Sequence, residues 1–211
     1  MKFLEFDRVL CLAPHPDDVE YSLGGTIVKY KDTHFDVLCL TEGGDCDSTT
    51  DASRLNEVKL SWEVSNSENH TLFFTPHRFL KDLGTDEWIG YIEKNFTNVT
   101  DYDAIITPSE NDSHFEHKIV SSFGWPLSRV KSISLVEYCS PSTLGDWIPN
   151  VFVDISNQYN TKLNMLKQFK SQLHRSYFDE EVIRGFHTHF QSSKKGIPLV
   201  EQFNLKQLFL K

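Results

Sequence analysis

The chain has 211 residues, of which 39% are hydrophobic, so it is long enough to bury a full core as one domain covering residues 1–211. It carries 21 basic and 30 acidic residues, a formal net charge of -9. No stripe of Lys and Arg with interleaved aromatic residues offsets this acidic balance, which excludes a nucleic-acid partner. No stretch approaches the ~20 apolar residues that a membrane helix requires, so we expect no membrane span.

The N-terminal residues and the cysteines both favour a cytoplasmic protein. The first eight residues include acidic side chains and lack the long apolar region and small-residue cleavage site of a secretory signal peptide. The four cysteines, Cys11, Cys39, Cys46 and Cys139, form no C-x-x-C pair, and three of them lie in apolar, strand-like runs. We therefore expect free thiols in a reducing compartment.

Short apolar runs alternate with helix-like segments along the chain, the pattern of βαβ units. We expect strands at residues 9–13, 35–40, 71–74, 104–107, 132–138 and 151–155. We expect helices near residues 22–30, 52–64, 86–96, 115–122 and 157–173. The order predicts an α/β protein, a single-domain Rossmann-like three-layer fold in which helices flank a mainly parallel sheet.

A His-Pro-Asp-Asp cluster directly follows the first expected strand, where open α/β sheets place their chemistry. Pro14 and Pro16 restrict the backbone on both sides of His15, so we expect a stiff, extended turn. Neighbouring side chains of extended chain point in opposite directions, so one of Asp17 and Asp18 can bind a metal while the other faces its bound water. A solvated turn is the simpler alternative, but two carboxylates behind a buried strand repel each other unless a cation or substrate lies nearby.

Gly24, Gly25 and Thr26 follow this cluster, and we expect them to open the first helix. Glycines before a helix N-terminus can cradle a phosphate. The spacing matches neither dinucleotide-binding nor P-loop motifs, and the preceding carboxylates would repel a phosphate. We therefore expect the glycines to let this helix approach the sheet closely.

A second polar cluster, Asp112-Ser113-His114-Phe115-Glu116-His117, follows the expected strand near residue 105. If Asp112 or Ser113 caps a helix that begins near His114, His114 and His117 lie three residues apart on one helix face. One imidazole could then bind a metal while the other carries a proton and stabilises developing negative charge. The alternative is a pair of surface histidines on a helix.

Residues 13–20, APHPDDVE, followed by GGT at 24–26, resemble the signature of the PIG-L/LmbE-like metal-dependent N-deacetylases of amino sugars. HFEH at 114–117 resembles the later His-x-Asp-His element of that family, with Glu116 where an aspartate is commoner. Weaker similarity at 41–44, 54–57, 135–138, 153–155, 171–172 and 201–203 extends the resemblance over most of the chain. Residues 178–195 match nothing that indicates the substrate.

The resemblance implies a zinc-dependent hydrolase that removes an acetyl or other acyl group from the amine of an N-acetylated amino sugar or its conjugate. His15, Asp18 and His117 would be the metal ligands and leave a fourth position open for water, with iron or another divalent metal as the alternative to zinc. Asp17 would be the general base. Protonated His114 would stabilise the oxyanion.

Arg54 would hold substrate hydroxyls or an anionic group, with a surface ion pair to Glu57 as the alternative. The expected partner is a small-molecule N-acyl amino sugar or conjugate, and the resemblance leaves open a homo-oligomer. Two other functions also stay open. One is a metal-dependent amidohydrolase that acts on a non-sugar N-acyl amine, and the other is a non-catalytic sugar- or metal-binding protein.

Overall fold

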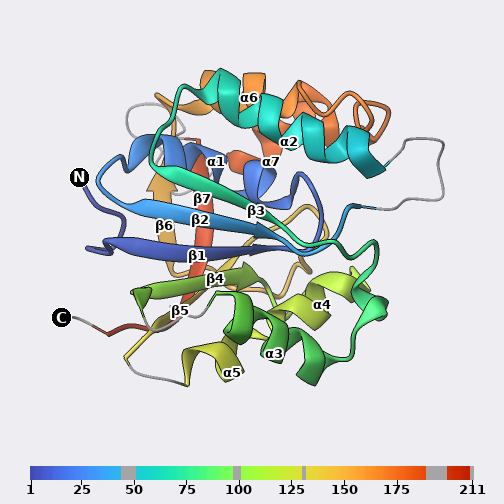
Figure 1. The fold of residues 1–211 in the computed structure, drawn as a ribbon. Helices are drawn as coiled ribbons and strands as arrows, with labels where there is room; N and C mark the ends of the chain where they lie inside the picture. Colours follow the sequence, from blue (N-terminus) through green and yellow to red (C-terminus); the bar gives the residue numbers. More distant parts are fainter. Residues whose placement is uncertain (44–50, 97–100, 130–131, 189–198, 210–211) are drawn as a thin grey trace.

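The computed structural model describes residues 1–43, 51–96, 101–129, 132–188 and 199–209, and Cys46 lies outside them. A seven-stranded sheet lies between two layers of helices (Figure 1). The strands are β1 (Arg8–Ala13), β2 (His34–Cys39), β3 (His70–Phe74), β4 (Ala104–Pro108), β5 (Ser134–Tyr138), β6 (Val151–Asp154) and β7 (Val200–Gln207). The predicted α/β, Rossmann-like three-layer fold with a mainly parallel sheet is confirmed.

The strand order is β3-β2-β1-β4-β5-β7-β6. Strands β1 to β5 pair in parallel, whereas β7 runs antiparallel to both β5 and β6. The chain leaves β1 for β2 on one side and returns after β3 to β4 on the other side. Ligands of such sheets bind where the strand order reverses, so the candidate crevice lies at the carboxyl ends of β1 and β4.

Helices cover both faces of the sheet. The helices are α1 (Asp18–Lys29), α2 (Asp51–Ser65), α3 (Thr85–Asn95), α4 (Phe115–Ser121), α5 (Gly124–Ser128), α6 (Tyr159–Leu166) and α7 (Glu180–His187). In Figure 1, α1, α2, α6 and α7 lie on one face and α3, α4 and α5 on the other. Alternate β1 residues enter two separate cores, Val9 and Cys11 on the α1 side and Leu10 and Leu12 on the α3 side. Burial on both faces explains why β1 is a continuous apolar run.

The glycine pair lies inside α1, because this helix begins at Asp18 and not near residue 22. The expectation that the glycines open the helix is therefore wrong, but the expected close approach is present. A Cβ atom at Gly25 would lie 3.0 Å from side-chain atoms of Ile155 and 3.1 Å from Oε1 of Glu201. Gly25 thus lets α1 pack tightly against β7 and against Ile155, which directly follows β6.

Four other elements differ from the prediction. The helix expected over residues 157–173 ends at Leu166, and the chain continues in turns to a short 3-10 helix, Ser176–Phe178. Strand β7 was not predicted, although it lies between β5 and β6. Helices α5 and α7 were also not expected.

Three buried side chains form what we call the core ion cluster: Lys162 of α6, His187 of α7 and Glu201 of β7. Lys162 forms an ion pair with Glu201. Glu201 also accepts hydrogen bonds from the backbone N–H groups of Gly25, at 2.8 Å, and Thr26. The Nδ1–H of His187 donates to the carbonyl of Val200 at 3.0 Å. The cluster therefore ties α1, α6 and α7 to β7.

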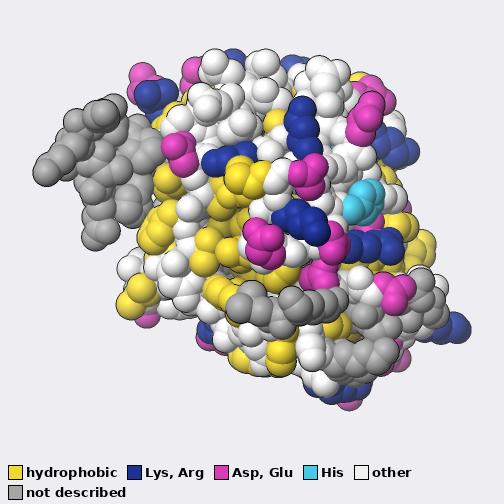
Figure 2. Space-filling view, turned by 90° about the vertical axis from the view of Figure 1, so that its left-hand side faces the viewer, with side chains coloured by type: hydrophobic (Ala, Val, Ile, Leu, Met, Phe, Trp, Pro, Cys, Tyr) yellow, Lys and Arg dark blue, Asp and Glu magenta, His cyan; other side chains and the backbone are white. Residues whose placement is uncertain are grey.

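Figure 2 shows the side of the molecule on which both chain ends lie in Figure 1. Acidic and basic side chains are interspersed there around an apolar area. None of the helices in the described ranges combines the length and apolar character needed to cross a bilayer.

Candidate metal centre and active site

The turn after β1 places two adjacent carboxylates at the start of α1. Asp17 has φ 110° and precedes the helix, and Asp18 is its first residue. Oδ2 of Asp18 accepts the backbone N–H of His15 at 2.8 Å, which closes the turn. The left-handed conformation at Asp17 costs on the order of 1–3 kcal/mol and marks the turn as a strained, specified one. The expected extended backbone is therefore wrong, although the two carboxylates do have different partners.

The turn after β4 brings the second cluster to the same edge of the sheet. Helix α4 begins at Phe115, and His114 is its N-cap, because its Nδ1 accepts the backbone N–H of Glu116 at 3.3 Å. Buried Asp112 supports this turn by accepting the N–H of His114 at 2.7 Å. The helix starts where the sequence indicated, but the residue that caps it is His114 and not Asp112 or Ser113. The rings of His114 and His117 stack with centroids 4.6 Å apart.

His15, Asp18 and His117 offer ligand atoms that all lie within 4.8 Å of one another. Nδ1 of His15 is 3.2 Å from Oδ2 of Asp18, and Nε2 of His117 is 3.2 Å from Oδ1 of Asp18. Two ligands of a tetrahedral zinc with bonds of ~2.0–2.1 Å lie about 3.3 Å apart. Two imidazoles and one carboxylate are also a common catalytic zinc ligand set. These residues therefore fit a zinc ion.

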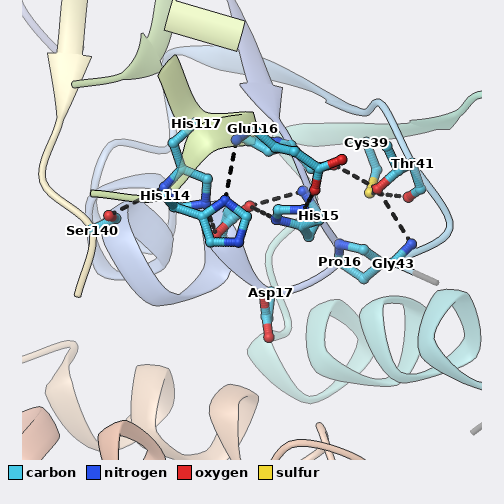
Figure 3. A network of polar contacts seen from close by, with 12 residues as sticks. His15, Pro16, Asp17, Cys39, Thr41, Gly43, His114, Glu116, His117 and Ser140 are labelled. Carbon is cyan, nitrogen blue, oxygen red and sulfur yellow. Dashed lines mark hydrogen bonds and ion pairs between the residues drawn. The ribbon is translucent and has the colours of Figure 1, made fainter. Parts of the chain in front are cut away.

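A second group, His15, His114 and Glu116, also lies within 4.8 Å. Nε2 of His15 is 2.5 Å from Oε2 of Glu116. This separation suits a short hydrogen bond and is too small for two ligands of one zinc ion. Figure 3 shows these side chains, with His117, gathered from the two turns.

Each of the two candidate ligand histidines, His15 and His117, has a carboxylate at its other ring nitrogen. Glu116 contacts Nε2 of His15, and Oδ2 of Asp112 lies 3.1 Å from Nδ1 of His117. Oδ2 of Asp112 also accepts the hydroxyl of Ser140 at 2.6 Å. Carboxylates in this position fix the tautomer and orientation of a metal-binding imidazole.

The charges of the site shift its pKa values strongly. Burial opposes charging of His15, but its hydrogen bonds to Asp18 and Glu116 outweigh this and raise its pKa to about 9. Burial likewise opposes charging of His117, whose pKa Asp18 and Asp112 raise to about 10. Against its own burial, the pKa of Asp18 is held well below its usual range by His117 and His15. The carboxylates therefore favour positive charge between these groups, carried either by ring protons or by a bound cation.

His114 behaves differently from the two ligand histidines. Burial and the neighbouring His15 and His117 lower its pKa. Because its Nδ1 accepts an N–H, the proton of the neutral ring is on Nε2. His114 can therefore donate a hydrogen bond through Nε2–H without being charged. Its expected protonated form stays a prediction.

Asp17 contacts Arg54, which is itself buried. Burial raises the pKa of Asp17 to about 7, although the Arg54 charge opposes the rise. One guanidinium nitrogen of Arg54 is 3.4 Å from Oδ2 of Asp17 and 2.8 Å from the carbonyl of Pro16, and the other donates to the carbonyl of Gly43 at 2.7 Å. Arg54 thus braces the turn that carries Asp17, and the surface position that a simple ion pair implied is wrong. Glu57 instead accepts two hydrogen bonds from Ser171.

A cavity of about 420 Å³ lies against this cluster. All six side chains singled out from the sequence line it: His15, Asp17, Asp18, Arg54, His114 and His117. The cavity is also lined by residues to which the sequence reasoning gave no role: Tyr21, Pro141, Ser142, Gln172, Arg175, Ser176 and Tyr177. The cavity is large enough for a small ligand.

Little in the sequence indicated that these additional residues would line the cavity. Gln172, Arg175 and Tyr177 fall in or just after a segment expected to be helical, and they reach the cavity only because α6 ends early. Tyr21 lies on the first turn of α1, and the sequence reasoning did not single it out. The phenol of Tyr21 donates to the carbonyl of Tyr177 at 2.8 Å and links α1 to this part of the lining.

The reversed strand order and the His-Asp-His cavity define a Rossmann-like protein with a candidate metal centre at the carboxyl edge of its sheet. A family model described as PIG-L, GlcNAc-PI de-N-acetylase, matches residues 10–127. The chain belongs to this family. The enzyme class is that of the N-deacetylases, which are hydrolases.

Comparison with individual proteins supports this family assignment. The chain is 31% identical over 204 residues to a diacetylchitobiose deacetylase of Thermococcus kodakarensis, covering 85% of this chain and 73% of the relative. The solved N,N'-diacetylchitobiose deacetylase of Pyrococcus horikoshii has a TM-score of 0.72 at 20% identity, covering 96% of this chain and 85% of the other. A 4-carboxy-2-hydroxymuconate hydratase of Pseudomonas putida KT2440 has a TM-score of 0.70 at 16% identity, covering 100% and 98%. The fold is therefore shared by enzymes with different reactions.

Proposed function

We propose that this enzyme is a zinc-dependent deacetylase that removes the acetyl group from the amine of an N-acetylated amino sugar or its conjugate. The observation that carries the proposal is the geometry of His15, Asp18 and His117. Each of the two carboxylate oxygens of Asp18 lies 3.2 Å from a ring nitrogen, one of His15 and the other of His117. The sugar-type substrate is supported by the family and by the named substrate of the Thermococcus relative.

His15, Asp18 and His117 would hold the metal and leave a position open toward the cavity. When bound, zinc lowers the pKa of a water ligand to about 7 and polarises the acyl carbonyl. Iron or another divalent metal held by the same residues would supply the same chemistry.

Asp17 acts as the general base and takes the proton of the attacking water. Its carboxylate is buried and is not one of the three proposed ligands, and Arg54 holds the turn that carries it. Negative charge then develops on the former carbonyl oxygen, and the Nε2–H of His114 donates a hydrogen bond to it. The proton held by Asp17 passes to the leaving amine, which completes the hydrolysis.

The test is acetate release from purified, zinc-loaded enzyme. The panel should contain N-acetylglucosamine, N,N'-diacetylchitobiose, an N-acetylglucosaminide, a nucleotide-linked N-acetylglucosamine and, as a non-sugar arm, N-acetylated amino acids. We expect acetate from at least one sugar substrate, loss of that activity after chelation and recovery with zinc. Acetate release from only the non-sugar arm would contradict the sugar assignment, and undiminished release after complete metal removal would contradict the metal assignment.

We also propose that residues 1–211 act as one deacetylase domain in the cytoplasm. Cys11, Cys39 and Cys139 are all free, which suits a reducing compartment. Cell fractionation tests the location. Light scattering of the purified protein tests whether it forms the homo-oligomer that the family resemblance left open.

A further inference from the structure

His15 lies between two carboxylates that compete for its ring proton. Its Nδ1 is 3.2 Å from Oδ2 of Asp18, and its Nε2 is 2.5 Å from Oε2 of Glu116. A neutral imidazole has one N–H and one lone pair. If the proton were on Nδ1, it would point to Asp18 and leave no lone pair on the nitrogen that faces the candidate metal position.

Glu116 favours a proton on Nε2, because its contact with the ring is the shorter of the two, 2.5 Å against 3.2 Å to Asp18. It lies on the first turn of α4, and its backbone N–H is held by Nδ1 of His114. From that turn the side chain crosses to His15, on the other loop of the site (Figure 3). The shorter aspartate that is commoner in this motif has one methylene less with which to cross.

In His117, the other proposed ligand, the two ring nitrogens have exchanged roles. Asp112 faces Nδ1 of His117, and Nε2 of that ring faces Asp18. His15 therefore turns Nδ1 toward Asp18, whereas His117 turns Nε2 toward it. In both rings the remaining nitrogen contacts a second carboxylate, that of Glu116 or Asp112. This pairing would be coincidental if Glu116 only stabilised its helix.

We propose that Glu116 is a positioning residue of the metal centre, which keeps the proton of His15 on Nε2 so that Nδ1 presents its lone pair to the metal. The inference rests on the proposed zinc site. It assigns a role to the residue at which this chain departs from the usual motif.

The first test measures zinc affinity by competition with a chelator for Glu116→Gln. The variant keeps the size of the side chain but removes its charge, and we expect the zinc dissociation constant to rise roughly 10- to 100-fold. Glu180→Gln is the matched control, since it removes the same charge from an exposed side chain on α7. The melting temperature of the metal-free Glu116→Gln protein should stay close to that of the control, because a role limited to helix stability would lower it without changing affinity.

The second test is long-range ¹H–¹⁵N NMR of the histidine rings in the zinc-loaded parent, with His15 assigned by comparison with His15→Asn. We expect a protonated Nε2 and a metal-bound Nδ1 on His15. Zinc bound at Nε2 of His15 would overturn the proposal. So would a zinc affinity of Glu116→Gln equal to that of Glu180→Gln.

His117→Ala separates this inference from the function on which it rests. If His117→Ala loses zinc while Glu116→Gln binds it like the control, the proposed metal centre stands and the role of Glu116 is wrong. If His117→Ala binds zinc like the parent, the proposed metal centre itself fails.

Discussion

The active-site cavity and the core ion cluster both bury histidines beside charged groups, yet the histidines respond in opposite directions. Carboxylates flank His15 and His117 and raise their pKa values to about 9 and about 10. His187 is buried near the Lys162 ammonium, and both effects hold its pKa well below the usual range. Burial alone therefore does not identify a functional histidine.

The two regions also differ in how their charges are balanced. In the core ion cluster Lys162 offsets Glu201, which has backbone donors as well, so the charges are satisfied inside the protein. In the cavity, Asp17 lies against Arg54 and Asp18 lies between His15 and His117, and Arg175 lines the same cavity. A carboxylate between two imidazoles at an open cavity is suited to binding a cation, whereas a closed, buried ion pair is suited to holding elements together.

The largest expected difference between the regions is in metal content. His117→Ala removes one of three ligands, so we expect purified protein to fall from about one zinc per chain to a small fraction of that value. His187→Gln, which changes a buried histidine outside the cavity, should keep its zinc. Elemental analysis of both variants checks this, and equal zinc loss in the two would remove the distinction.

The next effect is on stability. Lys162→Met leaves Glu201 buried without its cation, which should reduce the free energy of unfolding by about 3–5 kcal/mol. The double variant Lys162→Met/Glu201→Gln removes both charges and should recover much of the loss. Urea unfolding measures the free energies, and kcat of the folded fraction should stay near the parental value. A large fall in kcat for the folded double variant would show that the cluster is not merely structural.

The smallest effect is a pH dependence of stability that His187 alone contributes. In the folded protein His187 stays neutral, whereas in the unfolded chain it binds a proton as the pH falls below its ordinary pKa of 6.5. The unfolded state then binds more protons, so the free energy of unfolding should fall below pH 6.5 by up to about 1.4 kcal/mol per pH unit. His187→Phe should lack this part of the slope between pH 6.5 and pH 5, in urea titrations of zinc-saturated protein. An unchanged slope would mean that His187 is protonated in the folded state.

Much of the sheet could be predicted because its strands are buried on both faces. Strand β1 and its neighbours appear in the sequence as short apolar runs, which is the local mark of parallel strands between helices. Strand β7 could not be found in this way, since it is half-exposed and mixes polar with apolar residues. Its place between β5 and β6 depends on long-range pairing.

The residues proposed to bind the metal could be predicted in the same way, since His15 and Asp18 follow β1 directly and His117 follows β4. The other lining residues could not be predicted, because Arg175 and Tyr177 reach the cavity through the turns and the short 3-10 helix after α6, whose early end no local signal indicated. The roles of Asp17 and Asp18, identical neighbours, depend on a left-handed residue that the sequence did not predict.

The most direct test of the account measures zinc content and deacetylation rate on the same preparations of Asp17→Asn and Asp18→Asn. Asp17→Asn should keep about one zinc per chain while kcat falls roughly 10²- to 10⁴-fold, as for a lost general base. Asp18→Asn should lose both zinc and activity, because it removes a ligand. Loss of zinc from Asp17→Asn with retention by Asp18→Asn would invert the assignment, and full activity of Asp17→Asn would contradict the mechanism.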